Sequence, residues 1–486
     1  MPVKIILRYF NWESVVGLLA ICAVLAISYL ISQIQNPLKI IIFLAGIIVL
    51  ILSFIRIDWC FLALVFITYT NLSEVMIEYH SMPSVAKLYV VILLLFIMLR
   101  WILYGEQPGG NLVIFLILIL YIASISITLL YANESSRALH VIITYAKEVV
   151  IALVAIMIIT RGVILRQVVW SLLIAGLFLS TISVHQHITG SFWSNYWGFG
   201  RADYQQIVGE TDSFRLTGPL ADANFYGMVL LCLVPLSFER LKTEKNCFLR
   251  FIAACTLATS TLTIIFTYSR GALLALLVML FMIVAHLRHH MKMLLLFLTI
   301  SIILLPLLPT MYMDRLSTIS QSIPVTSIDD SDAGEDMSIN GRLSEMAVAW
   351  NIFLDHPILG IGAGNFPTYF QQYSLKLGLM NRGEAREAHS LYLQIAAERG
   401  LSGLFTFAIL LLLIIHSIKL SKSVFLQAGK FEFRDISWAF GVAFVGYLVA
   451  SLFLHDGYPR YFWLLVGIVL AMPQAAKWEL RQELGL

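Results

Sequence analysis

Charged residues are scarce in this chain of 486 residues. Asp, Glu, Lys and Arg make up 13% of the sequence, and hydrophobic residues make up 59%, whereas soluble domains carry about 25% charged residues. The composition therefore excludes an ordinary soluble protein and indicates an integral membrane protein. The formal net charge of +3 is also too small to imply a nucleic-acid partner.

Cysteine is rare as well, with five residues in the chain. Four lie inside apolar runs, and Cys247 lies in a Lys/Arg-rich loop that we place in the cytoplasm, so no disulfide framework is indicated. The sequence also has no internal repeat of the kind that builds the inverted halves of secondary transporters. It contains no convincing ligand set for a metal. Asp330 and Asp332 could hold Mg²⁺, but a solvated acidic segment is the stronger interpretation, and we expect neither metal nor cofactor.

Long apolar runs dominate what is present. A helix needs about 20 mostly apolar residues to cross the hydrocarbon core of a membrane. The chain is therefore predicted to be an all-α, polytopic membrane protein. Fourteen candidate spans lie near 15–32, 39–55, 59–73, 88–104, 112–132, 146–160, 167–185, 225–238, 251–268, 271–286, 293–309, 402–418, 435–455 and 461–474.

The distribution of Lys and Arg predicts the orientation of these spans. If the N-terminus is cytoplasmic, 18 of the 32 Lys and Arg residues lie in inner segments, as the positive-inside rule requires. Both termini are then inside, and two long loops are extracytoplasmic, where we expect the binding or catalytic face. The predicted division is 1–187 (spans), 188–224 (first long loop), 225–309 (spans), 310–389 (second long loop) and 390–486 (spans).

Polar residues and glycines gather between Asn340 and Gly403. Residues 342–354 have apolar side chains at helical spacing and are closed by Pro357, which predicts a short amphipathic helix lying on the membrane or on the protein. Its apolar stripe is expected to serve packing. The residues of that stripe are Leu343, Met346, Ala347, Trp350, and Phe353 or Leu354.

The glycines after this helix, Gly360, Gly362 and Gly364, have two interpretations. Their backbone amides could hold a phosphate, or they could form a tight loop. They follow a helix instead of a strand and lack the spacing of a dinucleotide fingerprint, so Rossmann-type binding is excluded.

Three arginines are predicted on the outer face in separate segments: Arg215, Arg270 and Arg342. Arg215 and Arg270 could be interfacial anchors, which is a common role for arginine beside a span. Alternatively, folding brings the three together around one anion. Guanidinium groups suit a diphosphate because they form bidentate bonds and keep their charge.

His389 lies where the second long loop meets an apolar run that returns to the membrane. A lone histidine there can be an interfacial hydrogen-bonding residue, but the position favours a proton-transfer role. Lys147 and Glu148 could also bind substrate near the outer face, although a structural anchor is the simpler interpretation.

These motifs resemble the signature of the O-antigen ligase and polymerase superfamily, in which Arg-Leu and Trp precede His-Pro and a Gly-x-Gly element, and a later His opens an apolar helix. The Ser269-Arg-Gly271 element is similar to the family, as is the segment with Arg215, Gly218 and Asn224, although Ala223 stands where Pro is usual. The resemblance covers residues 210–405. It implies a GT-C-like, multi-pass protein of the bacterial inner (cytoplasmic) membrane, in which twelve spans are common, with essential Arg and His residues on the outer side.

The resemblance also implies a glycosyltransferase that uses an undecaprenyl-diphosphate-linked glycan in surface polysaccharide assembly. We expect a metal-independent, inverting transfer, with a glycan, lipid or protein acceptor. Arg215, Arg270 and Arg342 would bind the diphosphate and His389 would handle the proton of the acceptor hydroxyl, with Asn224, Gly362 and Gly364 in support. A repeat-unit polymerase is the alternative within the superfamily. A multi-span permease or anion transporter is the alternative from another class, and the missing repeat argues against it.

Overall fold

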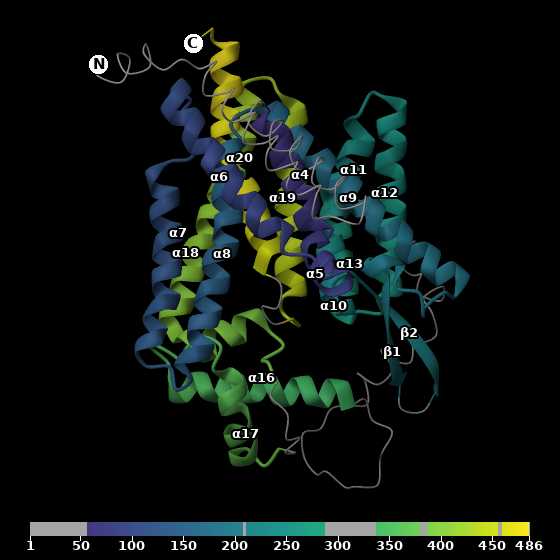
Figure 1. Ribbon diagram of the computed structural model, residues 1–486, viewed down its shortest axis with the longest axis vertical. Coiled ribbons are helices and arrows are strands. Elements are labelled where there is room, and N and C mark those ends of the chain that lie inside the picture. The colour runs from purple at the N-terminus through teal and green to yellow at the C-terminus, as the bar shows by residue number, and fades with distance from the viewer. Residues whose placement is uncertain (1–55, 208–209, 287–336, 380–385, 455–458, 486) are drawn as a thin grey trace, which may run out of the picture. The chain divides into compact units, whose positions relative to one another are not determined.

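A computed structural model describes residues 56–207, 210–286, 337–379, 386–454 and 459–485. The chain divides into two compact units, Met1–Cys60 and Phe61–Leu486. Nearly all of the described residues belong to the second unit, which is predominantly helical, as the sequence predicts (Figure 1).

Nine helices within the described ranges are long and apolar enough to cross a membrane, and the bent pair α4 (Ile57–Tyr69) and α5 (Leu72–His80) would make a tenth span. The chain is thus a multi-pass membrane protein. The nine are α6 (Val85–Tyr104), α7 with η1 (Leu112–Leu130), α8 (Ser135–Ile158), α9 (Gly162–Thr189), α10 with α11 (Ala223–Thr243), α12 (Cys247–Phe266), α18 (Leu391–Gln427), α19 (Phe431–Ala450) and α20 (Pro459–Glu483).

The expected spans agree well with these helices. Three of the fourteen, 15–32, 39–55 and 293–309, lie outside the described residues. Each of the other eleven coincides with one of the nine helices, with the bent pair, or with the shorter apolar helix α13 (Arg270–His286). The total number of spans and the GT-C-like arrangement stay predictions.

Local sequence explains where several of these helices begin. Asn111 caps α7, because its side chain accepts a hydrogen bond from the backbone N–H of Ile114 at 2.9 Å. Asp222 caps α10 in the same way, accepting from the N–H groups of Asn224 and Phe225 at 2.7 and 2.9 Å. Such caps satisfy amides that have no partner within the helix.

The first long loop of the prediction contains a β-hairpin that the sequence analysis missed. Strands β1 (Arg201–Ile207) and β2 (Glu210–Gly218) pair in antiparallel register, with Asp203 opposite Arg215. In Figure 1 this hairpin lies at one end of the second unit, together with α16 and α17. The connection between α11 and α12 and the last turns of α20 lie at the opposite end, and which end faces the cytoplasm stays a prediction.

The second long loop contains α16 (Met337–Asp355) and α17 (Phe366–Lys376). The expected helix over 342–354 is therefore confirmed, and α16 runs crosswise to the long helices (Figure 1). Leu343, Trp350 and Leu354 of the predicted stripe are about half exposed and do not pack fully on the protein, so contact of the stripe with the membrane stays a prediction. The buried face instead carries Glu345, Val348, Ala349 and Ile352.

A buried ion cluster ties three helices together at the predicted cytoplasmic end. Arg240 on α11 is 1% exposed and forms two hydrogen bonds with Glu239, at 2.6 and 2.7 Å. The Glu432 carboxylate on α19 accepts from Arg240 at 2.6 Å and from Arg166 on α9 at 2.7 Å. Removing one member would leave buried charge uncompensated, so the cluster fixes the relative positions of these helices.

Candidate active site

Arg215 joins the hairpin to two helix ends. It is 5% exposed; its Nε donates to the backbone oxygen of Thr267 at 2.8 Å and its Nη2 donates to the Asn224 side-chain oxygen at 2.9 Å. Asn224 is at the first turn of α10, and Thr267 comes directly before the turn that leads to Arg270. Arg215 and Asn224, two predicted site residues, are thus in direct contact, and Arg270 follows three residues after Thr267, the other partner of Arg215.

Arg270 is the first residue of α13 and is half-buried. A cation at a helix N-terminus opposes the helix dipole, so this arginine is poorly explained as a contribution to helix stability. Backbone N–H groups and positive potential at the same position favour an anion. The turn before it is tight, since Tyr268 has φ +51°. Arg270 and the start of α13 together form a cationic end suited to phosphate.

On α16, Arg342 precedes Glu345 by one helical turn, so the two lie on neighbouring positions of one face. Glu345 is 1% exposed and accepts a hydrogen bond from Arg386 Nη1 at 3.0 Å. Its second carboxylate oxygen lies 3.4 Å from His389 Nε2. The buried Glu345 carboxylate therefore contacts His389 and Arg386, and Arg342 lies one helical turn before it on α16.

The backbone at His389 is constrained. Its φ of +45° lies in the left-handed region, which a residue other than glycine adopts only when the surroundings require it. Ala388 beside it is fully buried, and the N–H of Leu391 donates to the Ser451 carbonyl at 3.0 Å. The imidazole is thus held at the start of α18 by its backbone as well as by Glu345.

The end of α19 connects the two groups of residues. A Cβ atom on Gly271, next to Arg270, would lie 3.3 Å from Phe453 Cβ. Phe453 and Ser451 belong to the same turn, and Ser451 holds the segment that begins α18. The arginine at α13 and the histidine at α18 therefore flank one structural element, which supports their assignment to one site.

The predicted supporting glycines form a tight loop. Gly362 has φ +100°, and a Cβ there would lie 2.7 Å from Ala132 Cβ; Gly364 has φ +70° and would meet Val141 at 2.8 Å. The N–H groups of Ile361 and Gly362 donate to carbonyls of α18 at 3.0 and 2.8 Å. Because those amides are engaged, the tight-loop interpretation is favoured over a phosphate cradle.

Asn365 completes this loop. It is fully buried, and its side-chain oxygen accepts from the N–H of Glu134 at 2.7 Å. The loop thereby connects α18 with the N-terminal end of α8. No spacing in the sequence signals this contact between residues 134 and 365.

Two residues of the site escaped the sequence analysis, Glu345 and Arg386. The signal for Glu345 was present: positions 345, 348, 349 and 352 have the i, i+3, i+4, i+7 spacing of one helix face. Within the described ranges, no group of three or more His, Cys, Asp and Glu residues is placed to hold a metal. Asp330 and Asp332 lie outside those ranges.

The long apolar helices and the polar cluster at one end define a multi-pass membrane protein with a charged site at the membrane surface. Residues 255–408, 154 of the 486, match the family model described as O-antigen ligase. The match confirms the resemblance seen in the motifs and supports membership of the O-antigen ligase and polymerase superfamily. No curated protein matches the chain.

The family supports a ligase-type, glycosyltransferase-like function in surface polysaccharide assembly, with a lipid-linked glycan donor and a glycan acceptor. Arg270, Arg342, Gly362, Gly364 and His389 lie within the matched residues. Arg215 and Asn224 precede them, so their place in the site rests on the contacts described above.

Proposed function

We propose that the protein transfers a glycan from polyprenyl (undecaprenyl) diphosphate to an acceptor hydroxyl on the extracytoplasmic side of the bacterial inner membrane. The observation that carries this proposal is the contact between His389 and the buried Glu345, next to Arg342 and inside the matched domain. A histidine oriented by a carboxylate is well suited to accept the proton of a hydroxyl.

In this proposal the three arginines bind the diphosphate of the glycan donor. When the bond between the anomeric carbon and the phosphate oxygen breaks, the diphosphate leaves with the electron pair and its negative charge grows. Fixed guanidinium groups stabilise such charge without reorganisation during the reaction. We assign this stabilisation to Arg270 at the N-terminus of α13, to Arg215, which donates to Thr267 just before it, and to Arg342 on α16.

In this proposal His389 takes the proton of the acceptor hydroxyl. The acceptor oxygen forms the new bond to the anomeric carbon, and its proton passes to His389. Glu345 lies 3.4 Å from Nε2 of His389, so its negative charge stabilises the imidazolium that forms when His389 takes the proton. One displacement of this kind inverts the anomeric centre, and no metal takes part.

Ligation of a finished glycan and polymerisation of repeat units share this chemistry and differ in the acceptor. The permease considered from the sequence has no support in the family match. Reconstitution separates these possibilities: purified full-length protein in liposomes, given lipid-diphosphate-linked glycan and candidate acceptors, should release lipid diphosphate as glycan is transferred. Movement of glycan across the liposome membrane without bond cleavage would refute the proposed function.

A further inference from the structure

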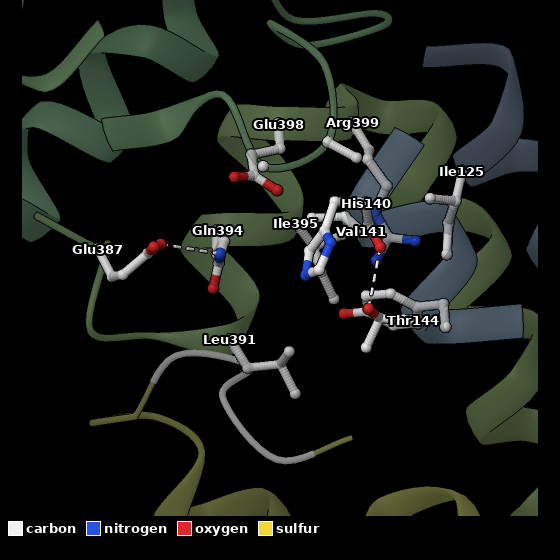
Figure 2. A pocket seen from close by; sticks show the side chains of 13 residues that line it. Ile125, His140, Val141, Thr144, Glu387, Leu391, Gln394, Ile395, Glu398 and Arg399 are labelled. Atoms are coloured by element: carbon white, nitrogen blue, oxygen red, sulfur yellow. Dashed lines mark hydrogen bonds between the residues drawn. The ribbon is translucent and has the colours of Figure 1, made fainter. Parts of the chain in front are cut away.

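A cavity of ≈ 250 Å³ lies between α8, the glycine loop and the first turns of α18 (Figure 2). Its polar lining includes His140 from α8, Glu387, and Gln394, Glu398 and Arg399 from α18. Figure 2 shows the His140 ring in the middle of these side chains, with Glu387 and Gln394 joined at one side. None of these five side chains was assigned a role in the sequence analysis, which considered Lys147 and Glu148 on α8 instead.

The buried guanidinium group of Arg399 indicates that the cavity binds a ligand. It is 4% exposed, its Nη2 donates to the Tyr121 hydroxyl at 3.2 Å, and its guanidinium lies 5.1 Å from the centre of the Tyr121 ring. Its Nη1 is buried and has no hydrogen-bond partner among the described residues. Burial of a hydrogen-bond donor without an acceptor costs free energy, so we expect a bound ligand to place an acceptor atom next to this nitrogen.

The acceptor groups of the cavity are held in place. Glu398 is 6% exposed and accepts a hydrogen bond from the N–H of Phe366 at 3.3 Å. The Gln394 amide donates to the Glu387 carboxylate at 3.2 Å, which fixes both side chains at the wall. The cavity is therefore lined by both donors and acceptors, and hydrogen bonds hold Glu398, Gln394 and Arg399 in position.

The rest of the lining is largely aliphatic and includes Ile125, Val141, Leu391 and Ile395. Fixed polar groups around an apolar wall suit a sugar ring, whose hydroxyl edge both donates and accepts and whose C–H face is apolar. A lipid tail is disfavoured because it would leave these polar groups unpaired. A small anion is disfavoured because two carboxylates accompany the one guanidinium. The volume is below the range of about 300–1,000 Å³ for drug-sized ligands, so it fits a single ring.

We infer that this cavity binds one uncharged sugar ring of the glycan substrates. The inference rests on the proposed function and assigns it a sugar subsite. Glu387 lines the cavity and is two residues before His389 in the chain. A sugar ring bound in the cavity therefore lies close to the atoms that react. The ring can belong to the acceptor or to the donor glycan, since both present the same chemistry.

Direct binding tests the inference without any transfer. Saturation-transfer NMR on the purified full chain would use glucose, galactose, mannose, N-acetylglucosamine and N-acetylgalactosamine as probes. At least one should give a signal that falls at least fivefold in His140→Ala and Gln394→Ala. Leu139→Ala, an exposed neighbour on α8 outside the cavity, should keep it. Absence of signal from every probe, or equal signals in all variants, would overturn the inference.

Transfer kinetics then identify the source of the ring. If the ring belongs to the acceptor, Gln394→Ala should raise the KM for acceptor at least tenfold and leave the KM for donor unchanged. If it belongs to the donor, the effects should be reversed, and unchanged values for both would overturn the inference. His389→Ala should retain sugar binding. Sugar binding by a protein that performs no transfer would contradict the proposed function and leave the subsite standing.

Discussion

The carboxylate of Glu345 lies 3.4 Å from the imidazole of His389, although 44 positions separate them in the chain. Glu345 is buried on α16 and is also paired with Arg386. This contact orients the histidine at the start of α18, and it connects the amphipathic helix of the second long loop to the proposed chemistry.

Glu345→Gln should lower kcat and leave the KM for donor nearly unchanged, because Glu345 acts through His389 as a positioning residue. The loss should be smaller than the factor of about 10²–10⁴ expected for removing the proton-transfer group itself. Glu345→Asp should restore part of the activity. Steady-state transfer in membranes at matched protein levels measures this, with the exposed Leu343→Ala on the same helix as the control. A change confined to KM would contradict the positioning role.

Glu387 should make stability depend on pH. Burial raises the pKa of its carboxyl group, and the nearby charge of Arg137 offsets this only in part. A raised pKa means that this contribution to stability is fully present below the unfolded value of 4.5 and is lost as pH rises through the folded value. Glu387→Gln should therefore raise Tm relative to wild type at pH 7.5 and have little effect at pH 4. Equal Tm differences at both pH values would contradict it.

Gly362→Ala should destabilise the protein. Its φ of +100° is unfavourable for alanine, and the new Cβ would lie 2.7 Å from that of Ala132. Strain of this kind costs on the order of 1–3 kcal/mol. Thermal unfolding in detergent should show a lower Tm, while Gly378→Ala provides a control with a positive φ and open space around the Cβ. Similar Tm losses in the two variants would show that crowding at Ala132 is unimportant.

Transfer should survive chelation. If arginines stabilise the leaving diphosphate, EDTA should leave the rate within about twofold of its starting value, because guanidinium groups need no metal to hold their charge. The rate in purified, detergent-washed protein is the measurement. Loss of transfer that Mg²⁺ or Mn²⁺ restores would contradict the metal-free mechanism. It would favour the alternative that Asp330 and Asp332 hold a metal ion.

Hydrophobic periodicity and length were sufficient to predict the spans that lie in the described ranges, because a stretch of about 20 apolar residues has few other stable states. They were insufficient for the hairpin at 201–218, whose strands are short and polar. They were also insufficient to predict which face of α16 packs on the protein. Both sides of that helix carry apolar residues, and the buried face includes Glu345, whose partner Arg386 is far away in sequence.

The candidate site also has one part that follows from sequence motifs and one part that does not. The assignment of Arg215, Arg270, Arg342 and His389 to the site rests on motifs that are recognisable in the sequence, and it stays a prediction. The cavity was not predictable, since its walls combine residues 140–145 with residues 387–399 and the contact between these segments depends on the glycine loop. A single sequence contains no signal for such a pairing.

The most direct test of the central claim is glycan transfer by Arg270→Lys and His389→Asn, measured beside donor binding at matched protein levels in membranes. Lysine keeps the charge of Arg270 but loses the bidentate fork, so we expect weaker donor binding and much slower transfer. His389→Asn should bind donor normally and lose turnover by about 10²–10⁴-fold. Near-normal transfer by both variants would show that these residues are interfacial anchors, and it would contradict the proposed active site.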